Sequence, residues 1–115
     1  MPPDLSLLYR IYDAFNARDI DAVLATTTPD VDWPNGWEGG RIQGQASVRD
    51  YWTRQWAAID PTVRPEGFLV LPDGRLRLDV RQTVRDHEGN LLSEGLVGHV
   101  YSFRDGLISK MEIEG

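Results

Sequence analysis

Cysteine is absent from the 115 residues, which excludes disulfides, thiolate metal sites and a cysteine nucleophile. The chain has only two histidines, His87 and His99, and neither has a companion at a metal-ligand spacing, so no zinc site or other cofactor is expected. No apolar run approaches the ~20 residues of a membrane span, and the first residues lack the pattern of a secretion signal. These absences predict a cytoplasmic protein with no membrane partner.

A concentration of positive charge is also missing. Twelve Lys and Arg residues stand against 18 Asp and Glu residues, a net charge of −6, and the basic residues are scattered. This argues against nucleic acid as a partner. The length predicts a single domain over residues 1–115, which buries roughly two-thirds of its unfolded surface without covalent staples.

The first half of the chain predicts three helices. Residues 4–18 place apolar side chains at steps of three and four, and Asp19 is a suitable cap for a short second helix. A third helix is expected over 46–59, with Trp52 and Trp56 on one stripe. Residues 31–33 predict a short strand, and the glycine-rich stretch 34–44 predicts a loop.

The second half predicts strands. Residues 75–85 alternate apolar and charged side chains, and three turn signals delimit strands near 62–71, 74–86, 91–103 and 107–114. Helices followed by a meander indicate an α+β fold with the helices on one face of the sheet.

Three segments resemble the nuclear-transport-factor-2-like superfamily, in particular its SnoaL-like branch of small bacterial proteins. These are residues 12–19 (YDAFNARD), Gly44 with 48–52 (VRDYW), and 99–108 (HVYSFRDGLI). The resemblance implies a cone-shaped fold, with three N-terminal helices packed on a curved antiparallel sheet around a pocket. It also implies frequent dimers through the convex sheet face. It does not imply one activity, since this fold hosts isomerases, cyclases, hydrolases and binding domains.

His99 and Asp32 are the candidate catalytic residues. His99 is in phase with Tyr101 and Phe103, which puts it on the aromatic face of its strand, and an imidazole there can act as acid or base near neutral pH. The alternative is a core histidine with one hydrogen-bond partner. Asp32 beside Trp33 could have a raised pKa and act as a base, or simply cap or solvate the loop.

The resemblance aligns His99 with the strand acid of ketosteroid isomerases and puts their base near Asn35, which cannot remove a proton. The last strand carries Met111 where SnoaL-like cyclases use that face for an aspartate. No known catalytic set of the superfamily is complete in this chain. The candidate ligand-binding residues are Tyr12, Trp33, Asn35, Trp52, Trp56, Gln82, Tyr101 and Met111.

Three functions remain open at this point. The chain is an isomerase, cyclase or hydratase acting on a small apolar molecule, a non-catalytic domain that binds such a molecule, or an interaction module with a filled cavity.

The face opposite His99 carries Leu96, Gly98 and Val100 with charged neighbours, which predicts a homodimer through that face.

Overall fold

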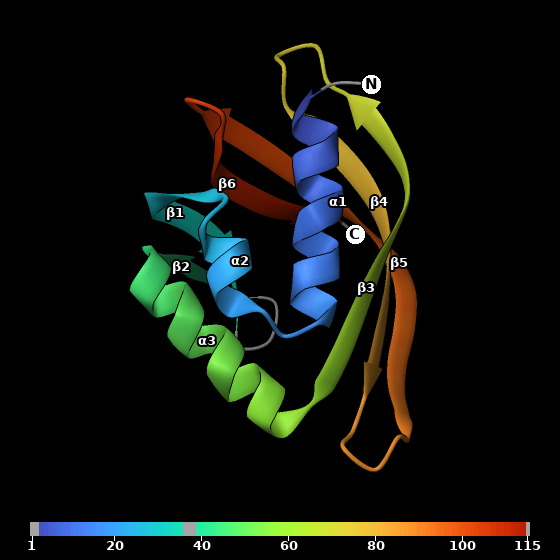
Figure 1. Ribbon diagram of the computed structural model, residues 1–115. Coiled ribbons are helices and arrows are strands. Elements are labelled where there is room, and N and C mark those ends of the chain that lie inside the picture. The colour runs from blue at the N-terminus through green and yellow to red at the C-terminus, as the bar shows by residue number, and fades with distance from the viewer. Residues whose placement is uncertain (1–2, 36–38, 115) are drawn as a thin grey trace.

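The computed structural model describes residues 3–35 and 39–114. Its helices are α1 (Pro3–Asn16), α2 (Ile20–Leu24) and α3 (Gln45–Ala58). Its strands are β1 (Thr27–Pro34), β2 (Arg41–Gln43), β3 (Asp60–Val70), β4 (Leu76–Arg85), β5 (Leu91–Arg104) and β6 (Leu107–Glu114). The predicted α+β order is confirmed, with the helices on one side of a curved sheet (Figure 1).

The sheet has the order β2-β1-β6-β5-β4-β3. Strands β3 to β6 form the predicted meander, and every pairing is antiparallel except that of β1 with β6, which is parallel. The predicted loop at 34–44 was wrong at both ends, because Pro34 closes β1 and Arg41–Gln43 pairs with it as β2. Residues 36–38 of that loop lie outside the described residues.

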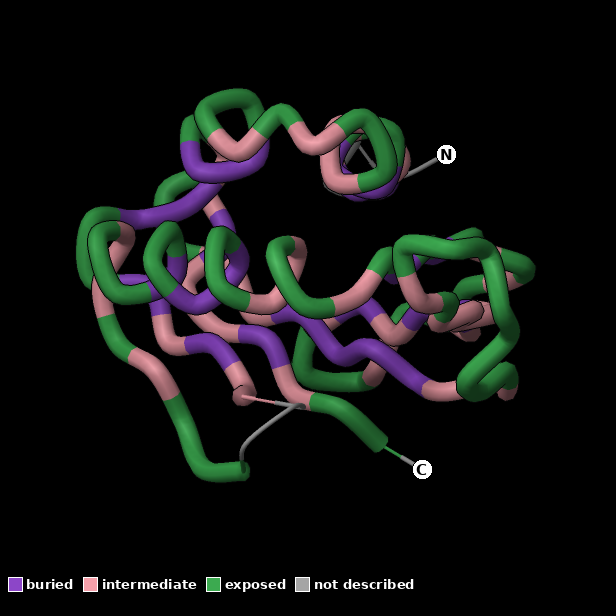
Figure 2. The backbone as a smooth tube through the Cα atoms, turned by 90° about the horizontal axis from the view of Figure 1, so that it is seen from below, coloured by how far each residue is buried: buried purple, intermediate pink, exposed green. Residues whose placement is uncertain are grey.

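The core lies between the helices and the inner face of the sheet. Buried residues of the helices and buried residues of the sheet face one another across this space (Figure 2). Leu5 and Leu8 of α1 and the alternating Leu76, Leu78 and Val80 of β4 belong to the same cluster of buried side chains. The period of about 3.6 in the helix and of 2 in the strand therefore direct both apolar faces into one core.

The outer face of the sheet differs from the apolar patch that the sequence predicted. Val100 is buried, because Arg77 and Glu112 are its direct neighbours on the two flanking strands. Gly98 is covered by the guanidinium of Arg77, so close that a Cβ on Gly98 would fall 2.6 Å from Nη2. Of the three predicted interface residues, only Leu96 remains exposed.

Candidate functional site

A cavity of about 530 Å³ opens between the helices and the inner face of the sheet. Helices α1 and α3 supply one wall, and strands β1 to β6 supply the other. Seven of the ten residues predicted for the site line it: Tyr12, Trp33, Trp52, Gln82, His99, Tyr101 and Met111. The other lining residues are Ile11, Phe15, Pro34, Arg41, Tyr51, Gln55, Pro61, Val63, Val97, Glu112 and Ile113.

Three lining side chains form a continuous hydrogen-bonded chain. The hydroxyl of Tyr12 lies 2.8 Å from Nδ1 of His99 and 2.8 Å from the hydroxyl of Tyr101. Tyr12 reaches this point from α1, whereas His99 and Tyr101 project from the same face of β5, two residues apart. A buried hydroxyl without a hydrogen-bond partner lowers the free energy of unfolding by about 1–3 kcal/mol. The hydrogen bonds among these three side chains avoid that cost and allow two tyrosines and a histidine to be buried together.

All three groups are neutral at pH 7. Burial lowers the pKa of His99 to about 4, because the imidazolium would lose its hydration. Burial likewise raises the pKa of Tyr12 well above its usual value, with a smaller contribution from Tyr101, and burial raises the pKa of Tyr101. The chain therefore presents uncharged hydrogen-bonding groups to whatever enters the cavity.

One nitrogen of His99 is left for a ligand. Within the described part of the chain, its hydrogen bond to Tyr12 uses Nδ1, and Nε2 has no partner. His99 is 6% exposed and lines the cavity, so this nitrogen belongs to a residue that a ligand in the cavity can reach. A neutral imidazole carries a proton on one nitrogen only, so Nε2 is either a donor or an acceptor toward the cavity.

Aromatic rings make up much of the remaining wall. Trp33 meets Trp52 edge to face at a centroid distance of 5.3 Å, and Phe15 meets Trp52 at 5.7 Å. Such pairs position large apolar surfaces with defined geometry. Trp56 stacks on Trp52 but does not line the cavity, and its indole nitrogen is buried without a partner among the described residues.

Two glutamines add polar groups to this wall. Gln55 donates to the hydroxyl of Tyr51 at 3.0 Å, which joins two lining residues of α3. Gln82 lies on the same face of β4 as Leu78 and Val80, and it lines the cavity. The interruption of the apolar pattern at Gln82 therefore marks a polar group of the cavity.

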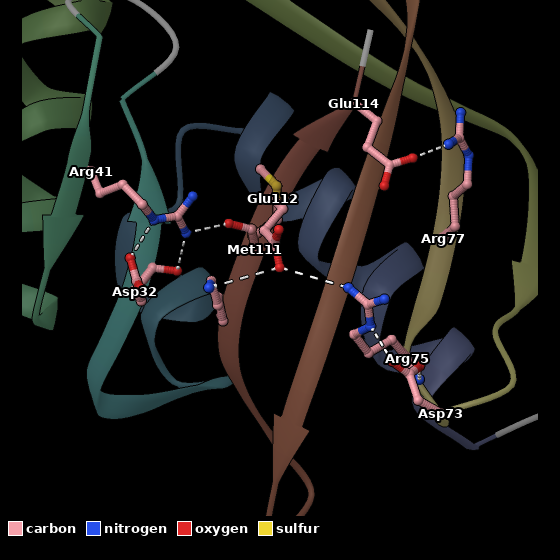
Figure 3. Close-up of polar contacts among 9 residues, drawn as sticks. Asp32, Arg41, Asp73, Arg75, Arg77, Met111, Glu112 and Glu114 are labelled. Carbon is pink, nitrogen blue, oxygen red and sulfur yellow. Dashed lines mark hydrogen bonds and ion pairs between the residues drawn. The ribbon is translucent and has the colours of Figure 1, made fainter.

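Asp32 is not brought together with His99. Alternation along β1 directs Val31 and Trp33 inward, which puts Asp32 on the outer side, where its carboxylate accepts a hydrogen bond from Arg41 at 2.7 Å (Figure 3). The expected acid–base pair is therefore not assembled. Asn35 follows β1 and is half-buried, but it too is outside the cavity lining.

Sequence reasoning missed Arg41 as a site residue. Arg41 was placed in an irregular loop, where no periodicity assigns a direction to a side chain. In the structure it belongs to β2 and lines the cavity beside Pro34 and Glu112. Its position between two glycine-containing segments gave no local signal of a strand.

The part of the chain that the structure describes contains neither a candidate metal centre nor a helix fit to span a membrane. Across residues 3–35 and 39–114, no three His, Asp or Glu side chains are grouped closely enough to hold a metal ion. None of the helices in those ranges combines the length and the apolar composition needed to cross a membrane.

Comparison with known proteins agrees with this architecture. Residues 8–111 match the SnoaL-like domain family. Because the match spans most of the sequence, the chain belongs to the SnoaL-like family, within the nuclear-transport-factor-2-like superfamily. No curated protein matches it in sequence.

Solved structures of the same fold accompany the family match. TerC, co-crystallized with polyporic acid, is 24% identical with a TM-score of 0.83, covering 96% of this chain and 89% of its own. An NTF2-like protein of unknown function from Burkholderia pseudomallei is 23% identical with a TM-score of 0.85, covering 99% and 91%. A Mycobacterium tuberculosis protein in complex with estradiol-17β-hemisuccinate is 21% identical with a TM-score of 0.83, covering 98% and 93%. At these identities the likeness establishes the fold.

Proposed function

We propose that the protein binds a small, largely apolar molecule that carries a neutral oxygen, such as a phenol or a ketone, in this cavity. The observation that carries the proposal is the Tyr101–Tyr12–His99 chain on the wall of an aromatic cavity of about 530 Å³. A largely apolar cavity with a few convergent polar groups is the usual form of a small-molecule site. TerC and the M. tuberculosis protein, each crystallized with a small molecule, are in agreement with this proposal.

The chain of three groups accommodates either kind of oxygen. If Nδ1 of His99 carries the proton, it donates to Tyr12, and Nε2 accepts from a phenol. If Tyr12 donates to Nδ1 instead, Nε2 carries the proton and donates to a ketone. The two arrangements differ in the tautomer of His99 and in the direction of the hydrogen bond between Tyr12 and Nδ1, and the hydroxyl of Tyr12 can turn to suit either.

Catalysis of the isomerase, cyclase or hydratase kind is the second candidate. The observation in its favour is that the same chain can pass a proton to or from a ligand. Against a base role, a pKa of about 4 makes His99 a weak proton acceptor at neutral pH. The carboxylate of Glu112, the one acidic residue lining the described cavity, pairs with Arg75 and Lys110. These facts favour binding over catalysis, and the presence of a cavity argues against the interaction module.

Calorimetric titration with three naphthalenes of similar size tests the proposal. We expect 2-naphthol and 2-acetylnaphthalene to bind about tenfold more tightly than 2-methylnaphthalene, because each gains one hydrogen bond worth roughly 1.4 kcal/mol. Equal affinities for all three compounds would mean that Tyr101, Tyr12 and His99 make no hydrogen bond to the ligand. Absence of binding at millimolar concentration would remove the pocket function itself.

We also propose that the protein forms a homodimer through the outer face of the sheet. Leu69 of β3 and Leu96 of β5 are 58% and 51% exposed and lie on that face. The ion pairs of Arg77 with Glu114 and Asp79 lie beside them. Apolar groups within a polar surround are a usual composition of an interface between two copies.

A further inference from the structure

Arg41 holds a fixed position at the wall of the cavity. Its Nε donates to Asp32 Oδ1 at 2.7 Å, and its Nη2 donates to the carbonyl oxygens of Met111 at 2.6 Å and Asp32 at 3.3 Å. These bonds join β2, which carries Arg41, to β1 and β6 (Figure 3). The guanidinium is therefore oriented before any ligand arrives.

Within the described parts of the chain, the remaining terminal nitrogen of this guanidinium has no hydrogen-bond partner. A guanidinium has five N–H donors, and the three bonds above use Nε and both hydrogens of Nη2. Nη1 has no partner among the described residues, and the Arg41 side chain is 39% exposed and lines the cavity. Among the described residues, the two N–H groups of Nη1 thus have no acceptor, and they belong to a residue that lines a mostly aromatic cavity.

Arg41 and His99 line the same cavity and are linked through neighbouring positions of β6 and β5. Met111, whose carbonyl holds the guanidinium, is directly opposite Tyr101 in the β5–β6 register, and His99 is two residues further along β5. Diagonal neighbours of this kind, here Met111 and His99, have backbones about 7–8 Å apart. Because Arg41 is held at Met111 and both Arg41 and His99 line the cavity, a fused aromatic pair with a polar substituent at each end is a suitable probe for the two groups.

We propose that Arg41 is an anchor for a carboxylate on the same ligand whose neutral oxygen contacts His99. This inference rests on the proposed function and narrows it to apolar molecules with a neutral oxygen at one end and an acid at the other. A carboxylate accepts charge-assisted hydrogen bonds from Nη1, which are stronger than bonds between neutral groups. Asp32 serves here as a positioning residue, because it contacts Nε and leaves Nη1 open.

Two carboxylates oppose an anion in this part of the cavity, that of Asp32 at Nε of Arg41 and that of the lining residue Glu112. The carboxylate of Glu112 is itself paired. It lies 3.7 Å from Arg75 and 3.9 Å from Lys110, so two cations offset its charge. The side chain of Glu112 is also 41% exposed, which lets solvent screen the repulsion. Selectivity for a carboxylate then comes from the directed donors of Arg41 rather than from a local excess of positive charge.

The test compares 6-hydroxy-2-naphthoate with 2-naphthol by calorimetric titration at neutral pH. We expect the carboxylate to bind the wild-type protein about tenfold more tightly. In Arg41→Gln the ratio of the affinities for the carboxylate and for 2-naphthol should shrink to within about twofold, because only the carboxylate loses its charged partner. Arg49→Gln is the matched control, because Arg49 is an exposed arginine of α3 that pairs with Asp21 and does not line the cavity.

Each outcome is decisive. Equal wild-type affinities for the two compounds, or a preference that survives in Arg41→Gln, would overturn the anchor and leave the proposed pocket intact. Binding of neither compound would overturn the pocket function, and the anchor with it. If Arg41→Gln fails to fold, the methyl ester of 6-hydroxy-2-naphthoate decides with the wild type. The ester has no anion, so it should bind no more tightly than 2-naphthol, and an ester that binds as tightly as the carboxylate would overturn the anchor.

Discussion

The hydroxyl of Tyr12 lies 2.8 Å from Nδ1 of His99, although the two residues are 87 positions apart in the chain. This contact joins the first helix to the fifth strand at the wall of the cavity. It leaves Nε2 of His99 as the imidazole nitrogen that can meet a ligand, and it connects that nitrogen through Tyr12 to Tyr101. The proposed function depends on this geometry.

Replacing His99 should affect ligand affinity more than folding. In His99→Asn, Tyr12 keeps its bond to Tyr101, so we expect the free energy of unfolding to fall by only about 1 kcal/mol. The affinity for 2-naphthol should fall about tenfold, which titration measures directly. His87→Asn is the control, because His87 lies in the exposed β4–β5 turn and should leave the affinity unchanged. A variant that melts several degrees lower but keeps the full ligand-induced shift would make His99 a core residue.

Acid should destabilise the protein through His99. The folded-state pKa of about 4 lies below the unfolded value of about 6.5, so the unfolded state binds more protons between these two pH values. The stability due to neutral His99 is complete above about pH 6.5 and is lost as the pH falls toward 4. Denaturant unfolding at pH 7.5 and at pH 5 should show a loss roughly 2 kcal/mol larger in the wild type than in His99→Asn. Equal losses in the two proteins would contradict the burial of a neutral imidazole.

Gly44 should resist substitution, because it precedes α3 with φ of 90° and ψ of 150°. Only glycine occupies this region without strain, so we expect Gly44→Ala to lower the free energy of unfolding by about 1–3 kcal/mol. Gly95→Ala is the control, because an added Cβ there would meet nothing within 4 Å and Gly95 has no positive φ. Thermal unfolding should give a lower melting temperature for Gly44→Ala than for Gly95→Ala. Equal melting temperatures would contradict backbone strain at position 44.

The proposed dimer should be sensitive to charge at Leu96. Sedimentation of the wild type at micromolar concentration should give about twice the mass of the 13.0 kDa chain. Leu96→Glu should return the mass to that of one chain, because two-fold symmetry places the new carboxylate in the interface twice. A wild-type protein that sediments as a single chain would refute the dimer.

The meander and its inner face could be predicted because local signals mark them. Turn sequences delimit the strands, and the period of 2 in β5 puts His99 and Tyr101 on one face. The same rule could have excluded Asp32 from the cavity. Adjacent residues of a strand point to opposite faces, so an inward Trp33 requires an outward Asp32.

Other features depend on contacts between distant segments. The parallel pairing of β1 with β6 joins residues near position 30 to residues near position 110, and no local pattern encodes it. Strand β2 is three residues long, too short for an alternation to show, which is why Arg41 was missed. The burial of Val100 comes from charged neighbours on two other strands, so its apolar character alone predicted the wrong exposure.

The most direct test of the central claim uses Met111, which lines the cavity and is 3% exposed. Met111 and Met1 are the two methionines of the chain, so a sample labelled with methyl-¹³C methionine gives two methyl signals. Assignment with Met111→Leu identifies the cavity signal. On titration with 2-naphthol, binding in the cavity should shift the Met111 methyl signal through aromatic ring currents until the signal saturates, while the Met1 signal stays in place. A Met111 signal that does not move at millimolar 2-naphthol would contradict binding in this cavity.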